Sequence, residues 1–136
     1  MDWIDVAPLL SGYAHMATVR PDGQPHVAKV APAVEGDVVW VATRASSRKA
    51  QNVMTIPKAA LMWEPAAEVY MSADVDVVTD LADKQRLWNS GLFPYPMEAF
   101  WGAPDKPDWL LLRLRPQHAT VMMEGESGLR RETWRA

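Results

Sequence analysis

Short apolar segments joined by tight turns constrain the first third of the chain most strongly. Residues 13–20 are strand-like and end at Arg20-Pro21-Asp22-Gly23, where proline and glycine suit a type I turn followed by a left-handed residue. Glu35-Gly36-Asp37 is a second hairpin signal, between a strand-like segment over residues 26–34 and the nearly continuous apolar residues 38–43. Three strands joined in this way predict an antiparallel meander.

The rest of the chain adds short strands and a few helices. Ala50, Val53 and Met54 have helical spacing, which predicts a helix over residues 47–56, and Pro57 lies just past its end. About six short strands with few helices favour a mainly β fold, a small barrel or sandwich. The other expected elements are a short helix over residues 2–10, strands over 59–63, 69–78, 109–114 and 119–123 with a break at Pro116, a helix over 80–88 and an irregular aromatic segment over 89–107. The polar tail over 125–136 is expected to fray, although Trp134 suggests some docking.

Size and composition exclude several classes of protein. The chain has 136 residues, 14 Lys and Arg against 17 Asp and Glu, a net charge of −3 and no cysteine. This length fits a single domain over residues 1–136. The mild acidity argues against nucleic-acid binding, and the lack of cysteine excludes disulfides and thiolate metal sites. The three histidines are isolated, so we expect no metal site. No apolar stretch is long enough to cross a membrane and the N-terminus is unlike a signal peptide, so we expect a cytoplasmic protein.

The predicted helix over residues 47–56 begins among cations. Arg44, Arg48 and Lys49 gather at its N-terminus, and no acidic residue lies between Asp37 and Glu64. Cations at this end oppose the helix dipole and typically cost a few tenths to about 1 kcal/mol each. An anion held by backbone N–H groups, serine hydroxyls and these side chains would explain the pattern, and phosphate is the natural candidate. The alternative is that the basic side chains are only solvated, and no glycine-rich phosphate loop supports a nucleotide site.

Several short motifs in a fixed order point to a family. They are the turn Asp22-Gly23-Gln24-Pro25, the hairpin Gly36-Asp37, a strand ending at Thr43, and the S-x-K-x-x-N sequence from Ser47 to Asn52. Together they resemble the first half of the pyridoxamine 5′-phosphate oxidase-like, flavin-binding split-barrel superfamily. The later sequence RLWNSGLFPYPMEAFWGAPDKPDWLLLRLRPQHATVM is similar to the general stress protein subgroup, so that the resemblance covers roughly residues 10–124.

The resemblance implies a six-stranded antiparallel split β-barrel that forms a homodimer with FMN at the dimer interface. Ser47 and Lys49 match the phosphate-binding positions of the family, and Thr43 matches the strand end beside the ribityl phosphate. Arg44 has a position and charge that suit the same phosphate. A related branch of the superfamily uses a deazaflavin, which is the alternative cofactor.

The resemblance also assigns residues to the flavin ring. Lys29 and Val30 would run along the isoalloxazine, and Trp101 lies in a segment expected to reach the flavin from the partner subunit. Ordinary core or dimer packing is the alternative for Trp101. Trp88 and Trp109 flank the same irregular segment, so part of the tryptophan content is expected to serve an interface.

The leading functional hypothesis is an FMN-dependent oxidoreductase with an unknown small-molecule substrate. No acid–base pair is evident, because the carboxylates lie mainly at turns and helix starts, and a bound flavin itself supplies the chemistry. The alternatives are a flavin-binding stress or sensing protein without turnover and a deazaflavin-dependent reductase. True pyridoxamine phosphate oxidases end in a substrate motif with arginine and histidine. This chain ends in LRRETWRA, so vitamin B6 oxidation is not expected.

Overall fold

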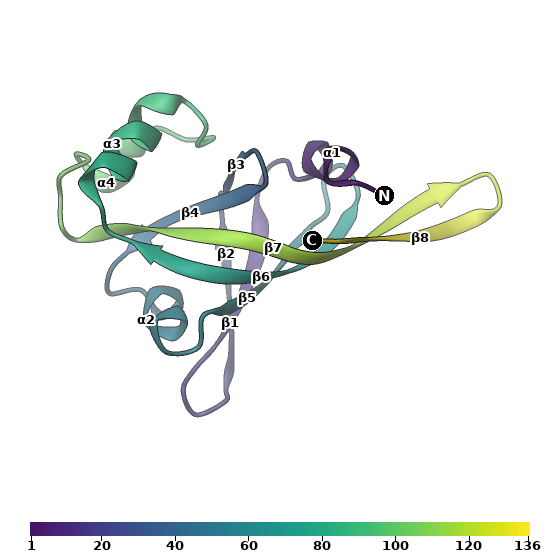
Figure 1. Cartoon of the computed structure of the whole chain (residues 1–136), viewed down its shortest axis with the longest axis horizontal. Coiled ribbons are helices and arrows are strands. Elements are labelled where there is room, and N and C mark those ends of the chain that lie inside the picture. The colour runs from purple at the N-terminus through teal and green to yellow at the C-terminus, as the bar shows by residue number, and fades with distance from the viewer.

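The computed structural model describes residues 1–136 as an eight-stranded antiparallel sheet with short helices around it (Figure 1). The prediction of a mainly β antiparallel fold is confirmed. The strands are β1 (Ala14–Val19), β2 (Pro25–Val30), β3 (Ala33–Glu35), β4 (Val38–Arg44), β5 (Lys58–Trp63), β6 (Glu68–Val78), β7 (Trp109–Gly125) and β8 (Gly128–Arg135). The helices are α1 (Trp3–Val6), the 3₁₀ turn η1 (Ala7–Leu9), α2 (Arg48–Thr55), α3 (Leu81–Ser90) and α4 (Met97–Trp101).

The long strand β7 organises the sheet. The strand order is β2-β1-β5-β6-β7-β4-β3, and β8 pairs with the far end of β7. β6 runs antiparallel to β7 over most of its length, whereas β4 pairs only with the first half of β7, from Leu114 back to Trp109. β8 pairs with the second half, and this hairpin extends away from the rest of the sheet in Figure 1.

Pro116 does not end a strand as the sequence predicts. β7 continues through it because the register against β6 shifts between Ser72, which faces His118, and Ala73, which faces Pro116. Gln117 is therefore the extra residue of a β-bulge, a position at which a strand tolerates a neighbour without an N–H. The break predicted at Pro116 is a bend within one strand.

The expected elements differ from the structure at two other places. The strand predicted over 26–34 is divided into β2 and β3, with Pro32 between them. The polar tail expected to fray instead forms β8, because Trp134 packs on Trp3 with ring centroids 4.9 Å apart. Trp3 is in turn held by a hydrogen bond from its Nε1 to the carbonyl of Gly36, at 2.7 Å.

β4 and the first half of β7 are buried on both faces. Leu110, Leu112 and Leu114 point into the main core, whereas Trp109 and Leu111 point into a second cluster beneath α3 and α4. This alternation explains why residues 109–114 read as a continuous apolar run. The second cluster attaches the α3–α4 region to the outer face of the sheet. The longest helix has 10 residues, and no helix has the length and apolar character to cross a membrane.

The docking of β8 gives a first prediction. Trp134→Ala should lower the free energy of unfolding by about 1–3 kcal/mol, because it removes a half-buried aromatic contact with Trp3. Leu129→Ala is the matched control, since Leu129 is 69% exposed near the tip of the same hairpin and should change stability by less than about 0.5 kcal/mol. Urea unfolding measures both values, and equal small effects would mean that the end of β8 is not docked.

Candidate functional site

The candidate site begins where β4 ends and α2 starts. Ser47 is the N-cap of α2, and its Oγ accepts a hydrogen bond from the backbone N–H of Ala50 at 3.2 Å. Thr43 Oγ1 lies 3.0 Å from Ser47 Oγ and donates to it. These two bonds fix the turn between strand and helix. They leave the first backbone N–H groups of α2, which have no carbonyl partner within the helix, next to Thr43 and Lys49.

A pocket of about 330 Å³ opens beside this turn. Five residues singled out by the sequence line it, although they come from β2, β4, α2 and α4: Lys29, Val30, Thr43, Lys49 and Trp101. The rest of the lining consists of Tyr13, Ala31, Ala42, Tyr95 and Phe100. The pocket therefore has two lysines and several aromatic rings in its wall, and no carboxylate or imidazole.

Lys49 is a half-buried cation without an anionic partner. It forms no ion pair or side-chain hydrogen bond within the chain. Burial lowers the pKa of its ammonium group from the usual value, because desolvation penalises the charged form. An anion in the pocket would remove this penalty, and the α2 N-terminus favours negative charge at the same place.

Arg44 and Ser47 do not line the pocket. Ser47 acts through the α2 cap and its bond with Thr43. Arg44 turns toward the loop that follows α4, where its Nη1 lies 2.7 Å from Asp108 Oδ2 and its Nη2 lies 2.9 Å from the carbonyl oxygen of Phe100. The positive charge next to the α2 N-terminus is therefore balanced in part by Asp108, which lies 64 residues away in sequence.

Trp101 lines the pocket of its own chain, and its reach to the flavin of a partner subunit stays a prediction. Its ring stacks on Trp109, with centroids 6.0 Å apart and planes 20° apart. Trp109 is the Cα partner of Arg44 in the β4–β7 ladder, so the stack brings α4 back over the end of β4. Trp101 Nε1 also donates to the hydroxyl of Tyr95 at 3.1 Å.

Sequence reasoning missed three aromatic lining residues, Tyr13, Tyr95 and Phe100. Burial raises the pKa of the Tyr95 hydroxyl. Tyr13 lies under the ammonium of Lys29, with Nζ 4.4 Å from the ring centroid. The only sequence signal for Tyr95 and Phe100 was the aromatic content of residues 89–107, which carries no periodicity from which a side-chain direction could be inferred.

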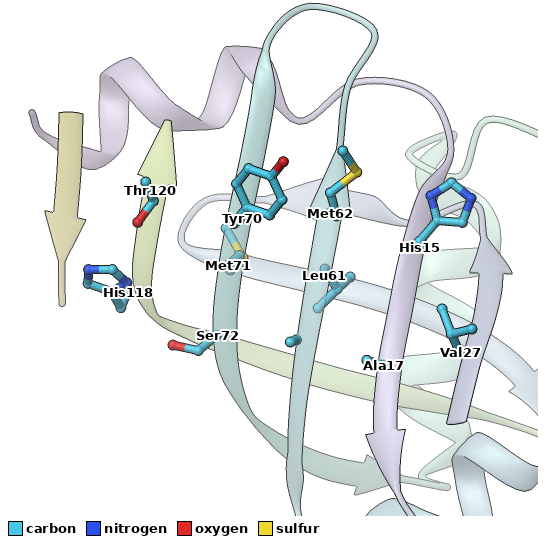
Figure 2. Close-up of a pocket in the computed structure, with 11 residues that line it drawn as sticks. His15, Ala17, Val27, Leu61, Met62, Tyr70, Met71, Ser72, His118 and Thr120 are labelled. Carbon is cyan, nitrogen blue, oxygen red and sulfur yellow. The ribbon is translucent and has the colours of Figure 1, made fainter. Parts of the chain in front are cut away.

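Next to this pocket, the outer face of the sheet is hollowed and almost free of charge (Figure 2). Two rows of side chains cross it from β2 to β7. The first row is Lys29, His15, Met62, Tyr70 and Thr120, and the second is Val27, Ala17, Ala60, Ser72 and His118. Among them only Lys29, at one end, carries a full formal charge. Val27 is 65% exposed and Tyr70 is 44% exposed. We call this surface the neutral sheet face.

The fold and the pocket define a class of protein: a split β-barrel with a pocket at the junction of a strand end and a helix start. Residues 9–123 match the pyridoxamine 5′-phosphate oxidase family, and the chain belongs to this family of FMN-binding split barrels. The prediction from the motif order is confirmed.

Solved structures show the same fold. General stress protein 26 from Bacillus anthracis is 19% identical with a TM-score of 0.75, covering 98% of this chain and 97% of that protein. An FMN-binding, pyridoxamine 5′-phosphate oxidase-related protein from Nostoc punctiforme is 17% identical with a TM-score of 0.58, covering 91% and 86%. An F420 reductase is 28% identical with a TM-score of 0.61, covering 82% and 93%. No curated protein matches the sequence significantly.

Proposed function

We propose that this protein binds FMN in the pocket between β2, β4, α2 and α4 and uses it as an oxidoreductase on a small-molecule substrate. The observation that carries the proposal is Lys49: a half-buried, unpaired cation that lines the pocket at the N-terminus of α2. A phosphate group would supply the missing negative charge. The family to which the chain belongs binds a cofactor that has such a group at one end.

The residues present fit the two ends of FMN. Lys49 and the first N–H groups of α2 would hold the phosphate, beside the turn that the Thr43–Ser47 hydrogen bond fixes. The ring would lie against Val30 and the aromatic side chains, with Lys29 beside it. The pocket volume of about 330 Å³ lies within the range of roughly 300–1,000 Å³ found for small-molecule sites.

The chain itself offers little acid–base chemistry at this site, since no carboxylate or histidine lines the pocket. When bound, the flavin would supply hydride and electron transfer. The protein would bind and orient the cofactor, with Lys49 at its phosphate and Lys29 beside its ring, and shield one side with the aromatic rings. The Lys29 ammonium group would favour negatively charged forms of the ring, which is one way in which a protein tunes flavin reactivity.

Two other functions have specific support. The 28% identity to an F420 reductase favours a deazaflavin as cofactor, whose ring differs from that of FMN. The likeness in fold to general stress protein 26 favours a stress-related flavin protein, including one without turnover. Isolation of the protein without added cofactor separates the deazaflavin alternative from the other two. FMN released on denaturation supports both the proposal and the flavin stress protein, a deazaflavin supports the first alternative, and failure to bind either cofactor refutes flavin binding.

Turnover is tested on the FMN-loaded protein. We expect nicotinamide dinucleotides, or another reductant, to reduce the bound flavin faster than they reduce free FMN. Absorbance of the oxidised flavin in stopped-flow mixing measures both rates. No acceleration with any reductant would favour a flavin carrier or sensor over an oxidoreductase.

Lys49→Glu should weaken FMN binding at least about tenfold, because a charge-assisted phosphate contact is replaced by repulsion. Arg48→Glu is the matched control: it makes the same charge change one residue away, on an exposed side chain that does not line the pocket. Its effect should stay within about twofold to threefold, consistent with a screened surface charge. Fluorescence titration measures both constants, and equal losses would place the phosphate elsewhere.

We propose that the expected homodimer forms through the neutral sheet face. Depletion of charge at the centre with charged groups around it is typical of a protein interface. Here the Lys58–Asp74 ion pair borders the face on one side and Glu68 borders it on the other. Because Lys29 belongs both to this face and to the pocket lining, a second copy bound here would border the flavin site.

Ala60→Arg tests this interface, since Ala60 is exposed near the middle of the face and a two-fold dimer would meet the new charge twice. We expect a dimer for the parent protein and a monomer for this variant, measured by light scattering at the same concentration. Ala66→Arg is the matched control, at an exposed position in the β5–β6 turn, and should remain dimeric. A dimer that persists in Ala60→Arg would locate the interface on another surface.

A further inference from the structure

Arg44 connects the end of β4 to the aromatic side of the pocket rather than to its phosphate end. Its guanidinium donates through Nη1 to Asp108 at 2.7 Å and through Nη2 to the carbonyl oxygen of Phe100 at 2.9 Å. The same group lies over the ring of Trp101, with 5.2 Å between Cζ and the ring centroid. An arginine can make these contacts together because its donors form a rigid planar fork with a stacking face.

The three contacts act on one short segment. Phe100 and Trp101 are the last residues of α4, and both line the pocket. The carbonyl of Phe100 is among the C-terminal carbonyls that a helix leaves without a partner, so Arg44 both satisfies it and complements the helix dipole. Asp108 lies at the other end of the loop that follows α4, immediately before Trp109. Arg44 thus ties both ends of this loop to the end of β4.

The interactions that Arg44 already makes also argue against direct contact with a phosphate. Its charge is paired with Asp108 through Nη1, and Nη2 donates a hydrogen bond to the carbonyl oxygen of Phe100. Lys49, in contrast, has no partner and lines the pocket. Recruiting Arg44 to a phosphate would break an ion pair and leave the Phe100 carbonyl without its donor, which costs more than using the free lysine.

We infer that Arg44 is a positioning residue: it holds the Phe100–Trp101 wall in place for the flavin ring and takes no part in phosphate recognition. This inference rests on the proposed function, because it assigns a role within the same flavin pocket. It divides the basic residues of the 44–49 segment into a wall clamp, Arg44, and an anion ligand, Lys49.

Comparison of FMN with riboflavin separates the two roles, since riboflavin has the same ring and no phosphate. Arg44→Met should weaken binding of both ligands by a similar factor, about threefold to tenfold, as expected for loss of a paired, stacked surface cation. Lys49→Met should weaken FMN binding and leave riboflavin binding unchanged. Loss of FMN binding alone in Arg44→Met would overturn the inference.

Asp108→Asn provides a second variant that leaves Arg44 intact. If Arg44 is a clamp, this change should weaken the binding of both FMN and riboflavin, because the loop that follows α4 loses its ion pair. If Arg44 were instead a phosphate ligand, Asp108→Asn should strengthen FMN binding, because Arg44 would be released from its ion pair. Riboflavin binding would then stay unchanged.

At saturating flavin, the visible circular dichroism of the bound ring should change in Arg44→Met and stay unchanged in Lys49→Met. General loss of stability would not alter that spectrum once the site is full, so an unchanged spectrum in Arg44→Met would overturn the inference.

A measurement on the ligand-free protein makes the inference testable independently of flavin binding. Amide hydrogen exchange over residues 97–109 should become at least severalfold faster in Arg44→Met, while exchange in α2 and β6 stays as in the parent. Unchanged exchange over 97–109, or equal acceleration everywhere, would overturn the clamp. If the parent binds neither flavin, the proposed function fails, and the exchange result still decides whether Arg44 holds this wall.

Discussion

The pairing of β4 with the first half of β7 is the constraint on which the candidate site depends. The register places Thr43 opposite Leu110 and Arg44 opposite Trp109. Thr43 leads into the α2 cap at the anion-attracting end of the pocket, and Trp109 supports Trp101 at the aromatic end. One stretch of ladder thus fixes the relation between the two ends of the pocket. A slip of one residue would turn Thr43 away from the pocket.

Burial explains why this register is held firmly. β4 and the first half of β7 are covered on both faces, by the main core on one side and by the cluster under α3 and α4 on the other. Lys84 of α3 strengthens the second contact, with Nζ donating to the carbonyls of Lys106 and Trp109 at 2.7 and 2.9 Å. The ammonium also lies 4.3 Å from the centre of the Trp109 ring. Lys84 therefore also holds the backbone that supports the aromatic wall.

Local signals predicted most of the fold, and long-range contacts account for what they missed. The turn at Asp22-Gly23 and the cap at Ser47 are determined by residues adjacent in the sequence, so sequence reasoning found them. Pro116 lacks the N–H of a regular strand residue, and only the shifted register against β6 shows that a bulge accommodates it. The ordered end of the chain likewise depends on Trp3, more than a hundred residues before Trp134.

The same distinction applies to the site. Thr43, Ser47 and Lys49 lie within seven residues, and the family resemblance assigned them to one phosphate site. Asp108 is remote, and without it the charge of Arg44 looked as free as that of Lys49. Tyr13 and Tyr95 contribute through their position on loops, for which hydrophobic periodicity gives no information.

The unpaired state of Lys49 links cofactor binding to the stability of the fold. In the ligand-free chain, burial disfavours its charged form, which is why the pKa of the ammonium is lowered. A bound phosphate would reverse that preference and raise the pKa, so part of the binding energy would offset a cost already present in the folded protein. Because a ligand that binds only the native state stabilises it, the loaded protein would be more resistant to unfolding than the free one. Arg44, whose charge is already paired, has no such cost to recover, and this difference separates an anion ligand from a clamp within one short basic segment.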